Sequence, residues 1–211
     1  MNLVSLTFDD GYLSQWRTAR LLARLGIFGT FFIPTGIKFL NGSPLMTSQP
    51  YLIKSLHAMG HEIGSHGVSH TVLKGKPMAM VEEECIKSKR YLEELLSCDI
   101  QGFAYPFGMF DDSVVNVVKK HYRYARGTVY DVDPYNFYTN DAFRIGGLGI
   151  SPRTQIYVVK NRLRHLHEHL FLVVIFHNEN PSKVLATVAF LRFLGLKFVR
   201  LSEFVATIVN T

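Results

Sequence analysis

The sequence is poor in the features that mark secreted and membrane-spanning proteins. Its 211 residues include only two cysteines, Cys85 and Cys98, which are too few for a disulfide framework and lack partners at zinc-binding spacing. The longest apolar runs, such as 171–176, are far shorter than the about 20 residues that cross a bilayer. Met1 runs straight into a strand-like segment, so we expect no signal peptide, no membrane span and a cytoplasmic protein.

Charged residues are also scarce, at 19% of the chain, whereas hydrophobic residues make up 47%. This balance supports a substantial core and excludes global disorder. The 23 lysines and arginines exceed the 17 aspartates and glutamates, which gives a net charge of +6. The excess is scattered and no nucleic-acid-binding motif accompanies it. A solvated basic surface is therefore favoured over attraction to an anionic substrate, and we expect no nucleic-acid partner.

No repeat, low-complexity tract or linker divides the chain, so we expect a single domain over residues 1–211. Short β-rich runs alternate with helical patterns, which predicts a parallel sheet with helical crossovers. The expected strands are 3–8, 29–33, 61–65, 102–104, 124–126, 171–176 and 197–199. The expected helices are 13–25, 47–59, 78–96, 112–121, 154–169, 182–194 and one from residue 202, with an irregular stretch over 127–149. About seven such units favour an α/β barrel, whose reactive groups sit at the C-terminal ends of the strands.

Two adjacent carboxylates, Asp9 and Asp10, follow the first expected strand and precede Gly11. Because neighbouring side chains point to different sides, one carboxylate can bind a metal while the other acts as a base. The same pattern can also serve as an N-cap and turn glycine for the next helix.

Two histidines, His66 and His70, follow the third expected strand in a turn that contains Gly67. Histidines four residues apart can present both imidazoles to one ion, and a carboxylate would complete a three-ligand site with open positions. The preceding strand and the glycine favour this interpretation over a chance pair on a solvated helix. By contrast, the histidine-rich segment 165–169 has no strand-end carboxylate nearby, so we interpret it as a solvated helix end.

Two more strand ends carry candidate site residues. Phe107 lies in a proline-fixed turn, Tyr105-Pro106-Phe107-Gly108, that can aim backbone N–H groups into a cleft or simply pack as an aromatic loop. His177 follows the apolar strand 171–176, where it either caps local backbone or faces a site.

Together the four motifs resemble the polysaccharide deacetylase family, the NodB-homology domain of carbohydrate esterase family 4. They occur in the family's order, and the resemblance extends from the first strand to residue 202. It implies a distorted, incomplete (β/α) barrel of about seven parallel strands. It also implies a metal-dependent hydrolase that removes acetyl groups from N-acetylated amino sugars, so the expected partner is an N-acetylated saccharide.

The resemblance assigns roles to the paired acids and histidines. It makes Asp9 the catalytic base, and Asp10, His66 and His70 the ligands of one divalent metal ion. Zinc is the first expectation, because imidazole and carboxylate suit it; cobalt, nickel and iron fit the same ligands. It also makes the backbone N–H of Phe107 a donor to the oxyanion. His177 corresponds to the general acid.

The chain departs from the family pattern in two places. The family's tryptophan-containing fourth motif is absent, since the only tryptophan is Trp16; the corresponding stretch offers three aspartates, Asp131, Asp133 and Asp141. Ala104 stands where many members have an arginine that contacts the base.

Arg144 is the expected substitute for that arginine. It lies in a short apolar segment, 143–145, from which its guanidinium could hold Asp9 by charge-assisted hydrogen bonds. A surface arginine on an irregular segment is the equal alternative.

Two other functions stay open at this point. One is a hydrolase of another non-peptide C–N bond in the same fold, and the other is a catalytically silent module that binds saccharide. The intact set of metal ligands argues against the silent module, because binding alone needs no aspartate base beside them.

Overall fold

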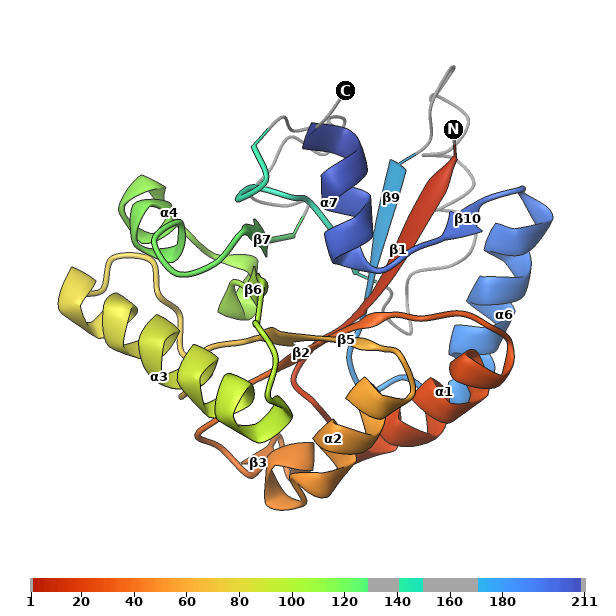
Figure 1. Ribbon diagram of the computed structural model, residues 1–211, viewed down its shortest axis with the longest axis horizontal. Coiled ribbons are helices and arrows are strands. Elements are labelled where there is room, and N and C mark those ends of the chain that lie inside the picture. The colour runs from red at the N-terminus through yellow and green to blue at the C-terminus, as the bar shows by residue number, and fades with distance from the viewer. Residues whose placement is uncertain (1, 129–140, 150–170, 210–211) are drawn as a thin grey trace.

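The computed structural model describes residues 2–128, 141–149 and 171–209 (Figure 1). One parallel sheet runs through it in the order β7-β6-β5-β2-β1-β9-β8, with β10 beside the start of β1. Its strands are β1 Leu3–Phe8, β2 Thr30–Ile33, β5 Glu62–Ser65, β6 Gly102–Ala104, β7 Tyr124–Arg126, β8 Leu148–Gly149, β9 Phe171–Phe176 and β10 Lys197–Phe198. The curled sheet confirms the predicted α/β class and the distorted barrel.

Helices cover the outside of the sheet, as Figure 1 shows for α1, α2, α3 and α6. They are α1 Leu13–Arg24, α2 Tyr51–Ala58, α3 Met78–Leu96, α4 Asp112–Val118, α6 Pro181–Phe193 and α7 Leu201–Val209. The helix expected over 154–169, the histidine-rich segment 165–169, and the aspartates at 131 and 133 lie outside the described residues. Among the described helices, none is both long enough and apolar enough to cross a bilayer.

Two small elements were not expected from the sequence. A hairpin joins β3 Phe39–Leu40 to β4 Ser43–Pro44, and its turn residues Asn41 and Gly42 both have positive φ. The other is β8, which lies inside the stretch expected to be irregular. Both consist of two-residue strands, which are too short to produce an alternating pattern in the sequence.

Alternation along β1 divides its side chains between two cores. Val4, Leu6 and Phe8 belong to the larger core, which includes buried residues of the outer helices, whereas Leu3 belongs to the smaller core inside the barrel. Successive side chains of a strand point to opposite faces, so positions 5, 7 and 9 share the inner face with Leu3. The end of β1 therefore delivers Asp9 to the barrel interior.

The barrel interior is crowded, and glycine makes room at two wall positions. A Cβ on Gly64 would lie 2.4 Å from the ring of Phe32, and one on Gly102 would lie 2.2 Å from the hydroxyl of Tyr124. Real Cβ atoms do not approach this closely, so the large inner side chains require glycine at these positions.

The segment 145–149 closes the wall between the two sheet edges. Ile145 forms a parallel bridge with Arg126 of β7, and its amide donates to the carbonyl of Ala125 at 3.2 Å. A few residues later, β8 pairs with β9. The short segment 143–145 thus contributes one bridge to the wall rather than a strand.

A polar group closes the N-terminal end of the barrel. The Glu62 carboxylate accepts hydrogen bonds from Thr30 Oγ1 and Tyr124 Oη, both at 2.7 Å, and from the Ser202 amide at 3.1 Å. Burial, together with the Glu62 charge, raises the pKa of Tyr124 well above its ordinary value. Because Ser202 lies in the first turn of α7, Glu62 fixes this helix across the N-terminal ends of the strands. The C-terminal ends of the strands are not covered by α7.

A buried histidine, His61, ties α1 to the start of β2. Its Nδ1 accepts a hydrogen bond from the Gly29 amide at 3.1 Å, and its Nε2 donates to the Ala19 carbonyl at 3.0 Å. Its ring meets the edge of Phe31 at a centroid distance of 5.1 Å. Burial lowers the pKa of His61 below its ordinary value, so the neutral ring is the folded form.

The buried neutral ring predicts a pH-dependent stability. Because the pKa of His61 is lower in the folded state, the unfolded chain binds the extra proton, and the free energy of unfolding falls as pH drops below about 6.5. Urea unfolding at pH 7.5 and 5.5 should show this loss, and His61→Gln should reduce it. His57→Gln, on the exposed face of α2, is the matched control. An unchanged pH dependence in His61→Gln would contradict the assignment.

Candidate metal centre and active site

Three side chains converge at the C-terminal end of the barrel strands. Asp10 follows β1, and His66 and His70 follow β5; one potential ligand atom from each lies within 4.8 Å of the other two. The Asp10 Oδ1 atom is 3.0 Å from Nε2 of His70 and 3.5 Å from Nε2 of His66. We call these three residues the ligand cluster.

Local hydrogen bonding and backbone conformation aim these side chains. Nδ1 of His66 donates to the Ala104 carbonyl at 2.8 Å, so Nε2 is the ring nitrogen that faces Asp10. Asp10 and His70 both adopt left-handed backbone conformations, with φ of 71° and 53°. Such conformations are unfavourable for residues other than glycine and persist where the surrounding structure holds them.

The ligand cluster fits a divalent cation. Burial raises the pKa of Asp10, but hydrogen bonds from His66 and His70 outweigh it and hold that pKa far below its usual range. The carboxyl group is therefore ionised, which is the form that a metal requires. One carboxylate and two imidazoles also match the donor set of a facial three-ligand site. Asp10, His66 and His70 are the residues that would hold such an ion.

Beside the ligand cluster, Asp9 forms a buried ion pair with Arg126. Nη2 of Arg126 contacts Oδ1 of Asp9, and the two residues are only 1% and 4% exposed. Nη1 also donates to the Gly127 carbonyl at 3.3 Å, and the guanidinium lies 5.2 Å from the Phe32 ring centre. The Asp9 carboxylate is thus compensated by arginine, whereas histidines approach the carboxylate of Asp10.

His177 completes this end of the barrel, and Gln15 fixes its backbone. Nε2 of His177 lies 3.9 Å from Oδ2 of Asp9, and the imidazole side chain is 50% exposed. The buried Gln15 amide of α1 donates to the carbonyls of Asp9 at 2.5 Å and of His177 at 2.7 Å. This one side chain therefore holds the ends of β1 and β9 in register, with the histidine facing both the carboxylate and solvent.

Phe107 lies at the edge of the ligand cluster. Its ring packs against His70 with a centroid distance of 4.8 Å, and its backbone is left-handed, with φ of 60°. The side chain is exposed, so the proline-fixed turn places it at the rim of the site rather than in the core.

Comparison with known proteins identifies the family. Residues 1–125 match the family described as polysaccharide deacetylase. The chain belongs to this family. The polysaccharide deacetylase chain is 27% identical over 122 residues to a peptidoglycan-N-acetylglucosamine deacetylase of Bacillus cereus, a match that covers 56% of this chain and 52% of that protein. It is also 32% identical over 128 residues to a gellan lyase of a Bacillus species, covering 59% of this chain and 5% of that protein.

Solved structures of carbohydrate esterase family 4 share the fold. A family 4 acetyl xylan esterase from Clostridium thermocellum, in complex with cobalt, superposes with a TM-score of 0.71 at 18% identity, covering 97% of this chain and 91% of that one. A family 4 pseudoenzyme from Bacillus anthracis superposes with a TM-score of 0.68 at 18% identity, covering 96% and 65%. These likenesses establish the distorted barrel of the polysaccharide deacetylases.

The prediction that Arg144 replaces the family's motif arginine is wrong. Arg144 lies outside the wall, where it pairs with Asp112 and, through Nε at 3.2 Å, with Asp141. In this chain the residue that reaches Asp9 is Arg126, the last residue of β7. The sequence held one usable signal, because Arg126 ends a correctly predicted strand two positions after an inward-facing tyrosine.

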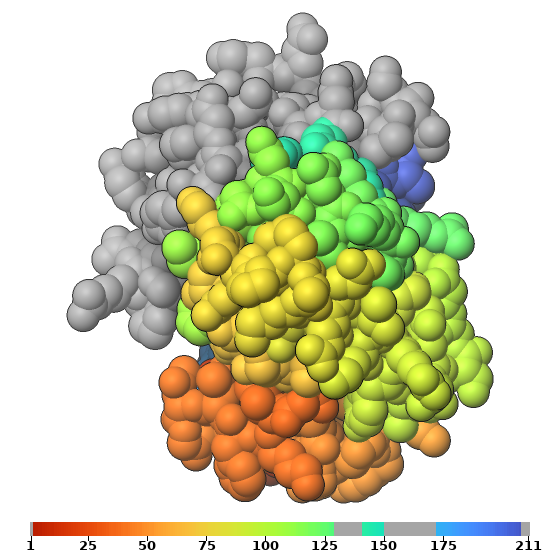
Figure 2. Space-filling view, turned by 90° about the vertical axis from the view of Figure 1, so that its left-hand side faces the viewer, coloured from red at the N-terminus to blue at the C-terminus, as the bar shows by residue number. Residues whose placement is uncertain are grey.

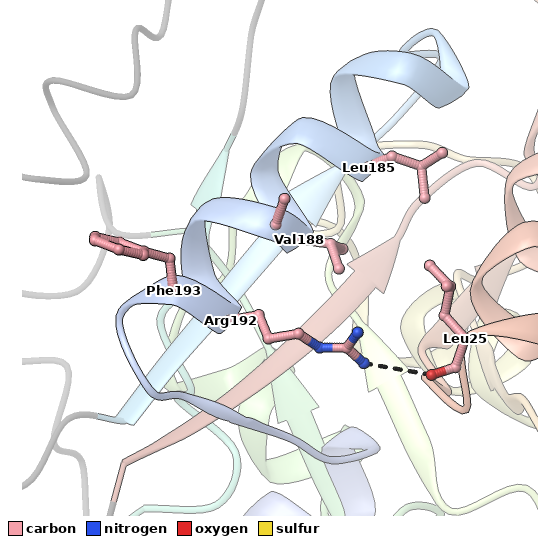
Figure 3. Close-up of a pocket in the computed structure, with 6 residues that line it drawn as sticks. Leu25, Leu185, Val188, Arg192 and Phe193 are labelled. Carbon is pink, nitrogen blue, oxygen red and sulfur yellow. Dashed lines mark hydrogen bonds between the residues drawn. The ribbon is translucent and has the colours of Figure 1, made fainter.

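A hollow between α1 and α6 includes no residue of the ligand cluster (Figure 3). It is lined by Leu25, Leu185, Val188, Ala189, Arg192 and Phe193, and Arg192 donates to the Leu25 carbonyl at 3.3 Å. Because these residues include no carboxylate or imidazole, the hollow lacks the groups needed for acid–base chemistry. The candidate active site is therefore the cluster at the strand ends.

The two arginines should differ sharply when replaced. Arg126→Ala should lower the free energy of unfolding by about 3–5 kcal/mol, because it leaves the buried Asp9 carboxylate without its partner. Arg144→Ala removes surface ion pairs and should change stability by at most about 1 kcal/mol. Denaturant unfolding at neutral pH measures both values, and equal losses would contradict the assignment of Arg126.

Proposed function

We propose that the chain is a metal-dependent hydrolase that removes acetyl groups from N-acetylated amino sugars. The observation that carries this proposal is the ligand cluster of Asp10, His66 and His70 beside the separately compensated carboxylate of Asp9. Family membership supports it, as does the partial similarity to a peptidoglycan-N-acetylglucosamine deacetylase. The proposed substrate is an N-acetylated saccharide.

The residues around the cluster divide the proton transfers of amide hydrolysis. When bound, a divalent ion supplies Lewis acidity that polarises an acetyl carbonyl and acidifies water. Asp9 accepts a proton from the attacking water, while Arg126 holds its carboxylate in one position. The backbone N–H of Phe107 donates to the oxyanion. His177 gives a proton to the departing nitrogen, so acetate and a free amine are released as the C–N bond breaks.

Zinc is the ion that we propose for the cluster. Imidazole and carboxylate suit it, and the three-residue set leaves positions for water and substrate. Cobalt is the ion in the acetyl xylan esterase that shares the fold, and it suits the same donors.

Substitution of the two aspartates tests the proposed division of roles. Asp9→Asn should abolish acetate release from N-acetylated oligosaccharides and leave bound metal in place, because it removes the base and spares the ligands. Asp10→Asn should lose metal and activity together. The measurements are acetate release and metal content per chain, with circular dichroism to confirm folding.

The same experiment separates the proposed function from its alternatives. Absence of acetate release by the metal-loaded wild-type chain, together with retained saccharide binding, would favour a silent module; a family 4 pseudoenzyme has the same fold. Equal loss of metal in both aspartate variants would instead reject the separation of base and ligand.

Replacement of the histidine after β9 tests acid catalysis. His177→Ala should lower kcat on an N-acetylated sugar by roughly 10²–10⁴-fold, the usual scale of general acid catalysis. The kcat on an activated acetyl ester should fall far less, because the leaving group of the ester departs without a proton. His57→Ala, on the exposed face of α2, serves as the control. A similar loss on both substrates would indicate that His177 positions other groups and does not act as an acid.

A further inference from the structure

A buried glutamate, Glu84, lies on the inner side of α3 and binds the turn between the two histidine ligands. Figure 2 shows the residues of α3, in yellow to yellow-green, across the middle of one face of the molecule. Glu84 is nevertheless only 7% exposed, so its side chain turns away from that surface. A buried carboxylate is costly unless hydrogen bonds replace the water that it loses.

The carboxylate of Glu84 accepts hydrogen bonds from two adjacent residues of the turn, Val68 and Ser69. Oε2 accepts from the amides of Val68 at 2.6 Å and Ser69 at 3.0 Å, and Oε1 accepts from the Ser69 hydroxyl at 2.6 Å. Hydrogen bonds to an ionised group are shorter and stronger than neutral ones. A single carboxylate therefore fixes the backbone immediately before His70.

This backbone needs such a support. His70 has a φ of 53°, a conformation that a residue with a Cβ adopts only where its surroundings maintain it. The glycine at position 67, with φ of 74°, is part of the same arrangement, because a Cβ there would lie 2.8 Å from Oε2 of Glu84. The turn is thus shaped around the carboxylate on one side and presents His70 on the other.

The next turn of α3 holds the start of the same loop. Ser88 Oγ donates to the Glu84 carbonyl at 2.6 Å and accepts from Ser65 Oγ at 2.7 Å. Ser65 Oγ in turn accepts from the Gly67 amide at 3.2 Å. Glu84 and Ser88 therefore hydrogen-bond to the residues that follow and precede His66. The loop cannot shift without breaking these buried polar contacts.

We propose that Glu84 is a positioning residue for the metal ion: it holds the turn 67–69 so that His66 and His70 meet Asp10 in a preformed site. The proposal rests on the proposed function, since it assumes that the ligand cluster binds a divalent ion. Groups that orient metal ligands from one step away raise metal affinity by about 10–100-fold.

The adjacent glutamate provides a matched control. Glu83 is exposed on α3, where it pairs with Lys87 one turn along the helix. Glu83→Gln and Glu84→Gln make the same chemical change one residue apart, and only the second touches the turn. Ser69→Ala is a further variant, which removes the hydroxyl bond to Glu84 and keeps both backbone bonds.

Titration of the apo chain, residues 1–211, with Co²⁺ measures the effect. Calorimetry gives the affinity, and the visible spectrum of bound Co²⁺ reports on the ligand geometry. Glu84→Ala should weaken Co²⁺ binding by about 10–100-fold. Glu84→Gln should weaken it less, because an amide oxygen at the position of Oε2 still accepts both backbone bonds but carries no charge. Glu83→Gln should match the wild type.

The outcomes separate positioning from simple stabilisation. A lower melting temperature for Glu84→Ala with unchanged Co²⁺ affinity and spectrum, measured well below that temperature, would overturn the proposal. If Glu84→Ala fails to fold, Glu84→Gln and Ser69→Ala decide: affinities equal to that of Glu83→Gln overturn it, and weaker ones support it. Failure of the wild-type chain to bind Co²⁺ would instead reject the proposed function, and this inference with it.

Discussion

Two neighbouring carboxylates are buried at the end of β1, and the compensation of their charge organises the site. Burying an ionised group is costly unless charges or hydrogen bonds replace the lost water. Asp9 obtains this compensation from the guanidinium of Arg126 across the barrel. Asp10 meets two imidazoles instead, which are groups that can also ligate a cation. The different partners give two chemically similar residues different surroundings, and the proposed division into proton acceptor and metal ligand rests on this difference.

This arrangement depends on how the barrel is built. The inner-facing positions at the ends of parallel strands meet at one edge, because alternate side chains of each strand share a face. That geometry brings the last residue of β7 against the residue that follows β1, although they are 117 positions apart in the chain. At the opposite end, Glu62 and α7 close the interior, and the candidate site lies at the C-terminal edge.

Three residues of the candidate site also carry backbone strain. Asp10, His70 and Phe107 all have positive φ without being glycine. Such conformations are maintained by their surroundings, and here the support comes from elements distant in sequence. Glu84 of α3 binds the turn before His70, and the Gln15 amide of α1 binds the carbonyls of Asp9 and His177. The outer helices therefore contribute hydrogen bonds to the site as well as apolar cover to the sheet.

The sequence by itself determined the longer strands, most helices and the residues of the ligand cluster. Local patterns predict those features: apolar runs of strand length, and polar motifs directly after them, such as Asp9 and Asp10 after β1. The tertiary structure alone decided which arginine reaches Asp9, because Arg126 and Arg144 both lie near strand-like segments and differ in which side of the barrel wall they face. The contacts of Glu84 likewise join distant segments that carry no matching pattern. Local sequence encodes periodicity and turn chemistry, whereas these pairings depend on how strands and helices are placed in space.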